Sequence, residues 1–165
     1  MKVEKSLILE KSHMNILIID DSLVNSQKIK KALEKNNYTI LQISNIFEAK
    51  KFIDSKHPDL IVLKAFSKKF DLINFLEENK NVISKLQIPV ILYETKDINI
   101  IKKAYDLGVV DILRKPFLIK ELSFKINFWI EYIKKQKESN HSSLLLQEYK
   151  DAVDESSIVS KTNDK

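Results

Sequence analysis

Short apolar runs alternate with segments of helical periodicity along most of the chain. The runs lie within residues 15–19, 36–44, 58–63, 88–93 and 109–114, and each is about as long as a β-strand. The segments that follow them, at residues 23–36, 45–56, 70–84, 97–107 and 118–138, place apolar residues three or four positions apart. Strands that alternate with helices in this way predict βαβ units.

The strands are nearly continuous apolar runs, which is typical of a parallel sheet that is buried on both faces. We therefore expect an α/β fold with a doubly wound, five-stranded parallel sheet, helices on both faces and an extended C-terminal helix. Sheets of this kind build their sites at the carboxyl ends of the strands.

Charged and polar residues, with one proline, follow several of the predicted strands. They are Asp20 and Asp21 after the first strand, Lys64 after the third, Glu94 with Thr95 after the fourth, and Lys115 with Pro116 after the fifth. Three acids and two lysines should thus meet at one edge of the sheet. Such an edge can be polar for solubility alone, but a carboxylate pair together with a Lys-Pro favours a site.

Composition narrows the class of protein. The chain has 165 residues, a net charge of +5 and no cysteine, so it has neither a disulfide nor a thiolate metal site. The lysines are spread along the chain, which indicates a solvated surface more than a nucleic-acid interface. No apolar run approaches the ~20 residues that span a bilayer, and we read no signal peptide. We expect a cytoplasmic protein without direct membrane or nucleic-acid contact.

Four stretches together resemble the response-regulator receiver domain. They are "ILIIDDS" at 16–22, "HPDLIVL" at 57–63, "IPVIL" at 88–92 and "AYDLGVVDILRKPF" at 104–117. The resemblance covers about residues 14–137 and leaves residues 1–13 as an N-terminal extension. It implies a flavodoxin-like (CheY-like) topology and a role in two-component, phosphorelay signal transduction.

The resemblance also assigns roles to the residues at the strand ends. In such domains an acidic pair after the first strand holds Mg²⁺, and Asp20 and Asp21 match it. The phosphoacceptor aspartate ends the third strand, and Lys64 stands at that position. Phosphoryl transfer to a receiver needs a carboxylate nucleophile and a divalent cation. An ammonium supplies neither and repels Mg²⁺, so we expect no catalytic residue and no cofactor; any metal would have to bind at Asp20 and Asp21.

The remaining positions depart from the family pattern to different degrees. The Ser or Thr that normally ends the fourth strand is replaced by Glu94, unless the register slips by one residue and Thr95 serves. The lysine that precedes a cis-proline matches Lys115 and Pro116. The aromatic switch position on the fifth strand is Ile112.

We hypothesise that Lys64 takes the place of the metal. Its charge would neutralise Asp20 and Asp21, while Glu94 pairs with Lys115 or with Lys64 itself. Such a cluster is tolerated only if its members are paired and hydrogen-bonded. The alternative is that Lys64 extends into solvent and the acids stay hydrated. Asp71 is a less suitable replacement phosphoacceptor, because it lies several residues beyond the strand end.

The C-terminal part offers surfaces beyond the sheet. The predicted helix at 118–138 carries one apolar stripe of Leu122, Ile126, Trp129 and Ile133, and further aromatic residues that suit a partner or a homodimer. Residues 138–165 begin with a polar break. Ser142 and Ser143 suit the cap of a further helix, and the last residues read as a strand. This tail resembles the start of a PAS sensory domain; the alternative is a disordered charged tail.

The sequence thus favours a non-enzymatic signalling module of a response regulator or hybrid signalling protein. It would be a pseudo-receiver that acts by contact with a protein such as a sensor histidine kinase or an attached output domain. One alternative is a phosphorelay receiver phosphorylated at an atypical site. Another is the regulatory N-terminal part of a DNA-binding or cyclic-dinucleotide-synthesising regulator.

Overall fold

The computed structural model describes residues 13–163 with the exception of residues 66 and 69. The predicted N-terminal extension, residues 1–13, therefore lies almost entirely outside the described residues. The strands are β1 (Met14–Ile19), β2 (Tyr38–Ile43), β3 (Leu60–Lys64), β4 (Val90–Thr95) and β5 (Asp111–Arg114). The helices are α2 (Leu23–Leu33), α3 (Ile46–Lys56), α4 (Leu72–Lys85), α5 (Ile98–Asp106) and α6 (Ile119–Asn163).

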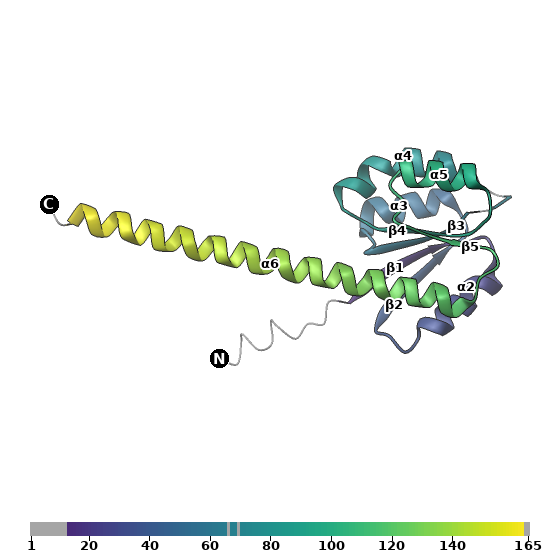
Figure 1. Ribbon diagram of the computed structural model, residues 1–165, viewed down its shortest axis with the longest axis horizontal. Helices are drawn as coiled ribbons and strands as arrows, with labels where there is room; N and C mark the ends of the chain where they lie inside the picture. The colour runs from purple at the N-terminus through teal and green to yellow at the C-terminus, as the bar shows by residue number, and fades with distance from the viewer. Residues whose placement is uncertain (1–12, 66, 69, 164–165) are drawn as a thin grey trace. The chain divides into compact units, whose positions relative to one another are not determined.

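The five strands form one parallel sheet in the order β2-β1-β3-β4-β5. Helices α3, α4 and α5 cover one face, and α2 with the first turns of α6 covers the other (Figure 1). The predicted doubly wound α/β architecture is confirmed. Because all strands run in the same direction, their carboxyl ends meet at one edge of the sheet.

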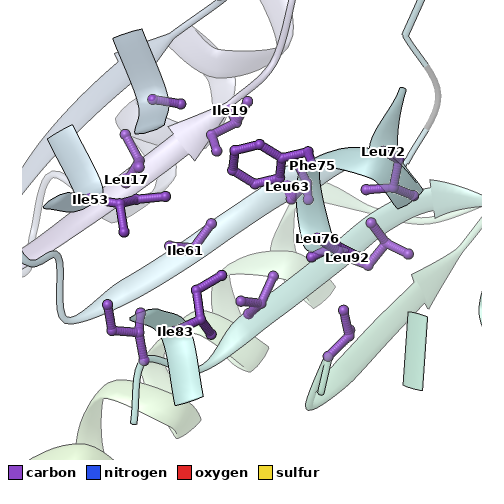
Figure 2. Packing of buried hydrophobic residues seen from close by; sticks show 14 of the residues in the cluster. Leu17, Ile19, Ile53, Ile61, Leu63, Leu72, Phe75, Leu76, Ile83 and Leu92 are labelled. Carbon is purple, nitrogen blue, oxygen red and sulfur yellow. The ribbon is translucent and has the colours of Figure 1, made fainter. Parts of the chain in front are cut away.

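The core consists mainly of aliphatic side chains from the strands and from the inner faces of the helices. Figure 2 shows Leu17, Ile61, Leu63 and Leu92 of the central strands against side chains of α3 and α4. These four strand residues have no exposed surface. Burying one such side chain stabilises a fold by about 1.5–3 kcal/mol. The well-packed central strands β1, β3 and β4 therefore fix the positions of the residues at their carboxyl ends.

Each helix from α2 to α5 begins at a polar cap. Ser22, Asn45, Asp71 and Asp97 accept hydrogen bonds from backbone N–H groups of the first turn. Gly108 follows α5 with a φ of 95°, a conformation that glycine adopts without strain. These local signals place the helix starts close to where the sequence predicts them.

Helix α6 differs from its prediction. It continues through residues 139–143 and on to Asn163, so the expected helix break at Ser142–Ser143 and the expected PAS-like strand near the C-terminus are both wrong. No glycine or proline follows Pro116 in the sequence, and serine alone interrupts a helix only weakly. In the described part of the chain, no helix combines the length and apolar character that crossing a bilayer requires.

The chain divides into two compact units, one up to Ile130 and the other from Glu131 onward. In the first unit the buried residues of α6 are Leu122, Ile126 and Ile130. Trp129, which we expected in the buried stripe, is half-buried and donates its indole N–H to Asp111 Oδ2 at 3.0 Å. In the last turn of the first unit, Ile130 is thus buried where the sequence predicted Trp129.

Candidate functional site

The charged residues predicted at the strand ends lie together at the carboxyl edge of the sheet. Asp20 and Asp21 directly follow β1, Lys64 is the last residue of β3, and Glu94 is the next-to-last residue of β4. Lys115 follows β5. The parallel register brings the ends of β1, β3 and β4 side by side, and the side chains form one cluster of charges, which we call the charge cluster.

The Lys64 ammonium is the centre of the charge cluster. Its Nζ lies 3.1 Å from Asp21 Oδ1, 3.6 Å from Asp20 Oδ1 and 3.6 Å from Glu94 Oε2. The Lys64 side chain is only 13% exposed. It therefore lies among three carboxylates and does not extend into solvent.

Glu94 is held in the cluster by an irregularity of its strand. The pairing of β4 with β5 shifts register between Tyr93 and Thr95, and Glu94 has a φ of 69°, which costs a non-glycine residue of order 1–3 kcal/mol. Glu94 Oε1 lies 2.6 Å from Lys115 Nζ. Thr95 is buried, and its Oγ1 accepts a hydrogen bond from the Asp97 backbone N–H at 3.3 Å. The carboxylate of Glu94, not the hydroxyl of Thr95, thus faces the lysines.

Two hydrogen-bonding residues of the site were not predicted from the sequence. Tyr93 donates its hydroxyl to Asp20 Oδ2, and Ser67 donates its hydroxyl to Asp21 Oδ2 at 2.9 Å. The backbone N–H of Ser22 donates to Asp20 Oδ1 at 2.7 Å. Asp20, which has no exposed surface, therefore has a hydrogen bond on each oxygen, as a buried carboxylate requires.

Electrostatics hold the central groups in their charged forms. Burial lowers the pKa of Lys64, but the hydrogen bond to Asp21 and the negative charges of Asp20 and Glu94 outweigh it, so the pKa is raised. Burial raises the pKa of Asp21, but hydrogen bonds from Lys64 and Ser67 outweigh it, and the pKa is lowered. At neutral pH, Lys64 is an ammonium and Asp21 a carboxylate.

Tyr93 extends the cluster toward the segment after β5. Burial and the hydrogen bond to Asp20 raise the pKa of Tyr93, so its hydroxyl stays protonated and acts as a donor. Its ring makes an edge-to-face contact with Phe117, with centroids 5.9 Å apart. The Lys115–Pro116 peptide bond, which lies between the end of β5 and Phe117, is cis. Ile112, at the predicted switch position, is half-buried in β5.

Among the described residues, Asp71 forms no hydrogen bond with the charge cluster. Its carboxylate Oδ1 accepts from the backbone N–H groups of Ile73 and Asn74 at 3.0 and 3.2 Å, as the N-cap of α4. The residue is exposed. The local helix start accounts for an aspartate at this position.

With this geometry in view, comparison with known proteins identifies the class. The model of the response regulator receiver domain matches residues 16–127, and the chain belongs to this family. It is 30% identical over 112 residues to the alkaline phosphatase synthesis transcriptional regulatory protein PhoP of Bacillus subtilis. It is 27% identical over 119 residues to the two-component response regulator ORR12 of rice, Oryza sativa subsp. japonica.

The matched regions cover most of this chain and varying shares of its relatives. The PhoP match covers 67% of this chain and 46% of PhoP, so the chain spans about half of that relative. The ORR12 match covers 71% of this chain and 98% of ORR12. A two-component response regulator from Clostridium difficile superposes with a TM-score of 0.63 at 28% identity and covers 72% of this chain and 97% of its own. The shared part is the receiver domain, which is a signalling domain.

Proposed function

We propose that this receiver domain is a pseudo-receiver, which signals through protein contacts without phosphorylation of an aspartate. The observation that carries the proposal is the place of the Lys64 ammonium, 3.1 Å from Asp21 and 3.6 Å from Asp20. In the resemblance described above, the residue at the end of β3 receives the phosphoryl group. A protonated lysine has no free electron pair with which to attack phosphorus.

Two further features of the site oppose phosphoryl transfer. The Glu94 carboxylate occupies the place of a hydroxyl donor and would repel the anionic phosphoryl group. Its Oε2 lies 3.6 Å from Lys64 Nζ, so the lysine and the glutamate also compensate each other's charge. Asp20, Asp21, Glu94, Lys64 and Lys115 carry three negative and two positive charges, which leaves the cluster close to neutral.

The donor set does not fit Mg²⁺. This ion requires oxygen ligands in near-octahedral geometry at 2.0–2.1 Å. Asp20 and Asp21 supply carboxylates, but each already accepts hydrogen bonds, and the ammonium of Lys64 lies at hydrogen-bonding distance from Asp21. A divalent cation bound there would lie beside a positive charge in a partly desolvated site. We therefore assign no role to a metal.

The proposed partners are proteins. The relatives include a transcriptional regulatory protein and a two-component response regulator by name. We propose that the domain contacts a sensor histidine kinase or an output domain attached to it, and that it associates with a second copy through α6. An attached output domain that regulates transcription, as the name of PhoP indicates for that relative, is a second form of the same proposal. We propose no catalytic residue in the domain itself.

The experiment compares the full chain with its Lys64→Asp variant, and uses Lys68→Asp as the matched control because Lys68 is an exposed lysine nearby in the loop. Each protein is titrated with Mg²⁺ in a calorimeter and incubated with acetyl phosphate and Mg²⁺ before mass spectrometry. We expect no Mg²⁺ binding and no phosphoryl adduct for the wild type and the control, and Mg²⁺ binding for Lys64→Asp. A labile phosphoryl adduct on an aspartate of the wild type would overturn the proposal in favour of a working receiver with an atypical acceptor.

A further inference from the structure

A basic stripe runs along the exposed side of α2. Val24, Lys28 and Lys31 lie on this helix at intervals of four and three residues, and Lys35 follows after another four in the turn behind it. Glu34, which caps the helix, has helical backbone angles, so Lys35 continues the same side. Val24 is 61% exposed, and the three lysines are exposed. The stripe thus has one apolar end and three cationic positions.

The second unit of the chain carries a stripe with the same intervals and opposite charge. Leu144, Glu148, Asp151 and Glu155 lie on α6 at intervals of four, three and four residues, and therefore on one side of the helix. Leu144 is 59% exposed, and the three acidic residues are exposed. This acidic stripe also begins with an apolar residue and continues with three charges.

Neither stripe has its charges compensated by an ion pair with a described residue of its own unit. Within the described residues, none of the three lysines and none of the three acids forms an ion pair. Asp151 accepts a hydrogen bond from Gln147 at 2.9 Å, which leaves its charge in place. Three cations and three anions at matching spacings are therefore open to a partner.

We propose that the basic stripe of α2 binds the acidic stripe of α6 from a second copy of this chain, with the two helices parallel. This orientation places Val24 against Leu144, and Lys28, Lys31 and Lys35 against Glu148, Asp151 and Glu155. An antiparallel orientation would place Val24 against Glu155 and Lys35 against Leu144. The parallel orientation therefore forms three opposite-charge pairs and one apolar pair, whereas the antiparallel orientation keeps two opposite-charge pairs and forms no apolar pair.

The contact joins two different surfaces, the α2 stripe of one copy and the α6 stripe of another. It either closes reciprocally into a two-fold dimer or continues into a longer assembly. An exposed ion pair contributes a factor of about 1.5–5 to an association constant, so three pairs and one apolar contact give a weak, salt-dependent association. The inference specifies the self-association put forward under the proposed function, but it is independent of Lys64 and the charge cluster.

The experiment uses charge reversal in the full chain, followed by sedimentation velocity over a range of concentrations. One variant combines Lys28→Glu, Lys31→Glu and Lys35→Glu, and we call it the α2 variant. The other combines Glu148→Lys, Asp151→Lys and Glu155→Lys, and we call it the α6 variant. Each alone opposes like charges, so we expect its association to weaken at least about tenfold relative to the wild type.

A mixture of the two variants provides the decisive comparison, because each reversed stripe then meets a stripe of opposite charge. We expect the mixture to associate about as tightly as the wild type. The matched control combines Lys30→Glu, Lys50→Glu and Lys51→Glu, which changes the net charge by the same amount at exposed lysines outside the stripe. The control should self-associate like the wild type, because both of its stripes are unchanged.

Salt provides an independent readout. Raising ionic strength from about 0.1 M to about 1 M shortens the Debye length from about 10 Å to about 3 Å, and the wild-type association should weaken accordingly. A wild type that is monomeric at every concentration overturns the inference, as does self-association that both reversed variants retain. Neither outcome affects the Mg²⁺ and phosphodonor tests of Lys64, so the two proposals fail separately.

Discussion

Replacing Lys64 by methionine removes the cation of the charge cluster but retains a long side chain at the end of β3. The change leaves Asp20, Asp21 and Glu94 without the ammonium that lies 3.1–3.6 Å away. Removing one partner of a buried ion pair costs about 3–5 kcal/mol. The side chains of Lys64, Asp21 and Glu94 are 13–16% exposed, so solvent and protonation relieve part of this cost. We expect the free energy of unfolding to fall by about 2–4 kcal/mol.

Tryptophan fluorescence during urea unfolding measures this change, because Trp129 is the single tryptophan of the chain and lies in the first unit. The matched control is Lys134→Met, which breaks the exposed ion pair with Glu131. That substitution should change the free energy of unfolding by at most about 1 kcal/mol. If Lys64→Met costs no more than the control at pH 7, the ammonium does not stabilise the cluster and the reasoning is wrong.

The remaining predictions concern the same site and its neighbours. The urea midpoint of Lys64→Met should rise with added Mg²⁺, whereas that of the wild type should not, since only the variant has an uncompensated acidic pair. Because the pKa of Lys64 is raised, its stabilising contribution is present below pH 10.5, the ordinary value, and is lost as pH rises through the folded-state pKa. Because the pKa of Asp21 is lowered, its stabilising contribution is present above pH 3.8, the ordinary value, and is lost as pH falls through the folded-state pKa. The urea midpoints of the wild type and of Lys64→Met, measured across pH, should therefore converge at both extremes of pH. Tyr93→Phe removes a hydrogen bond from fully buried Asp20 and should lower the free energy of unfolding by about 1–3 kcal/mol in the same assay. The phenyl ring has the same shape as the tyrosine ring, so packing should change little. Asp111→Asn removes the charge that accepts from a lysine and the tryptophan of α6, and should cost about 1–2 kcal/mol and shift the fluorescence maximum of the folded state.

The sequence was sufficient to predict the meeting of Asp20, Asp21 and Lys64. Apolar runs of strand length mark where the strands end, and in a parallel sheet those ends share one edge. The apolar run of the fourth strand did not decide between Glu94 and Thr95. That choice depends on the register shift between β4 and β5, and an extra residue in one strand leaves no pattern in the residue types of the strand itself.

Tyr93 and Ser67 show a second limit. Tyr93 reads as one more apolar residue of a buried strand, and only the fold brings its hydroxyl to Asp20, 73 positions earlier in the chain. Ser67 lies in a loop whose path the sequence does not specify. Hydrogen-bond partners that are distant in sequence require the three-dimensional arrangement, even where the charged residues they serve are evident.

Helix α6 shows how weak polar signals mislead. Ser142 and Ser143 are good N-cap residues, and the polar stretch around them suggested a break. A cap is needed only where the backbone leaves the helical conformation, and without glycine or proline the helix continues. The strand expected near the C-terminus failed for the same reason, because it depended on that break.

A high-resolution crystal structure of the wild-type protein grown in millimolar Mg²⁺ tests the central claim most directly. The account predicts the Lys64 ammonium among the carboxylates of Asp20, Asp21 and Glu94, with no divalent ion bound to the acidic pair. A hydrated metal ion between Asp20 and Asp21, with the side chain of Lys64 turned away from them, would contradict it.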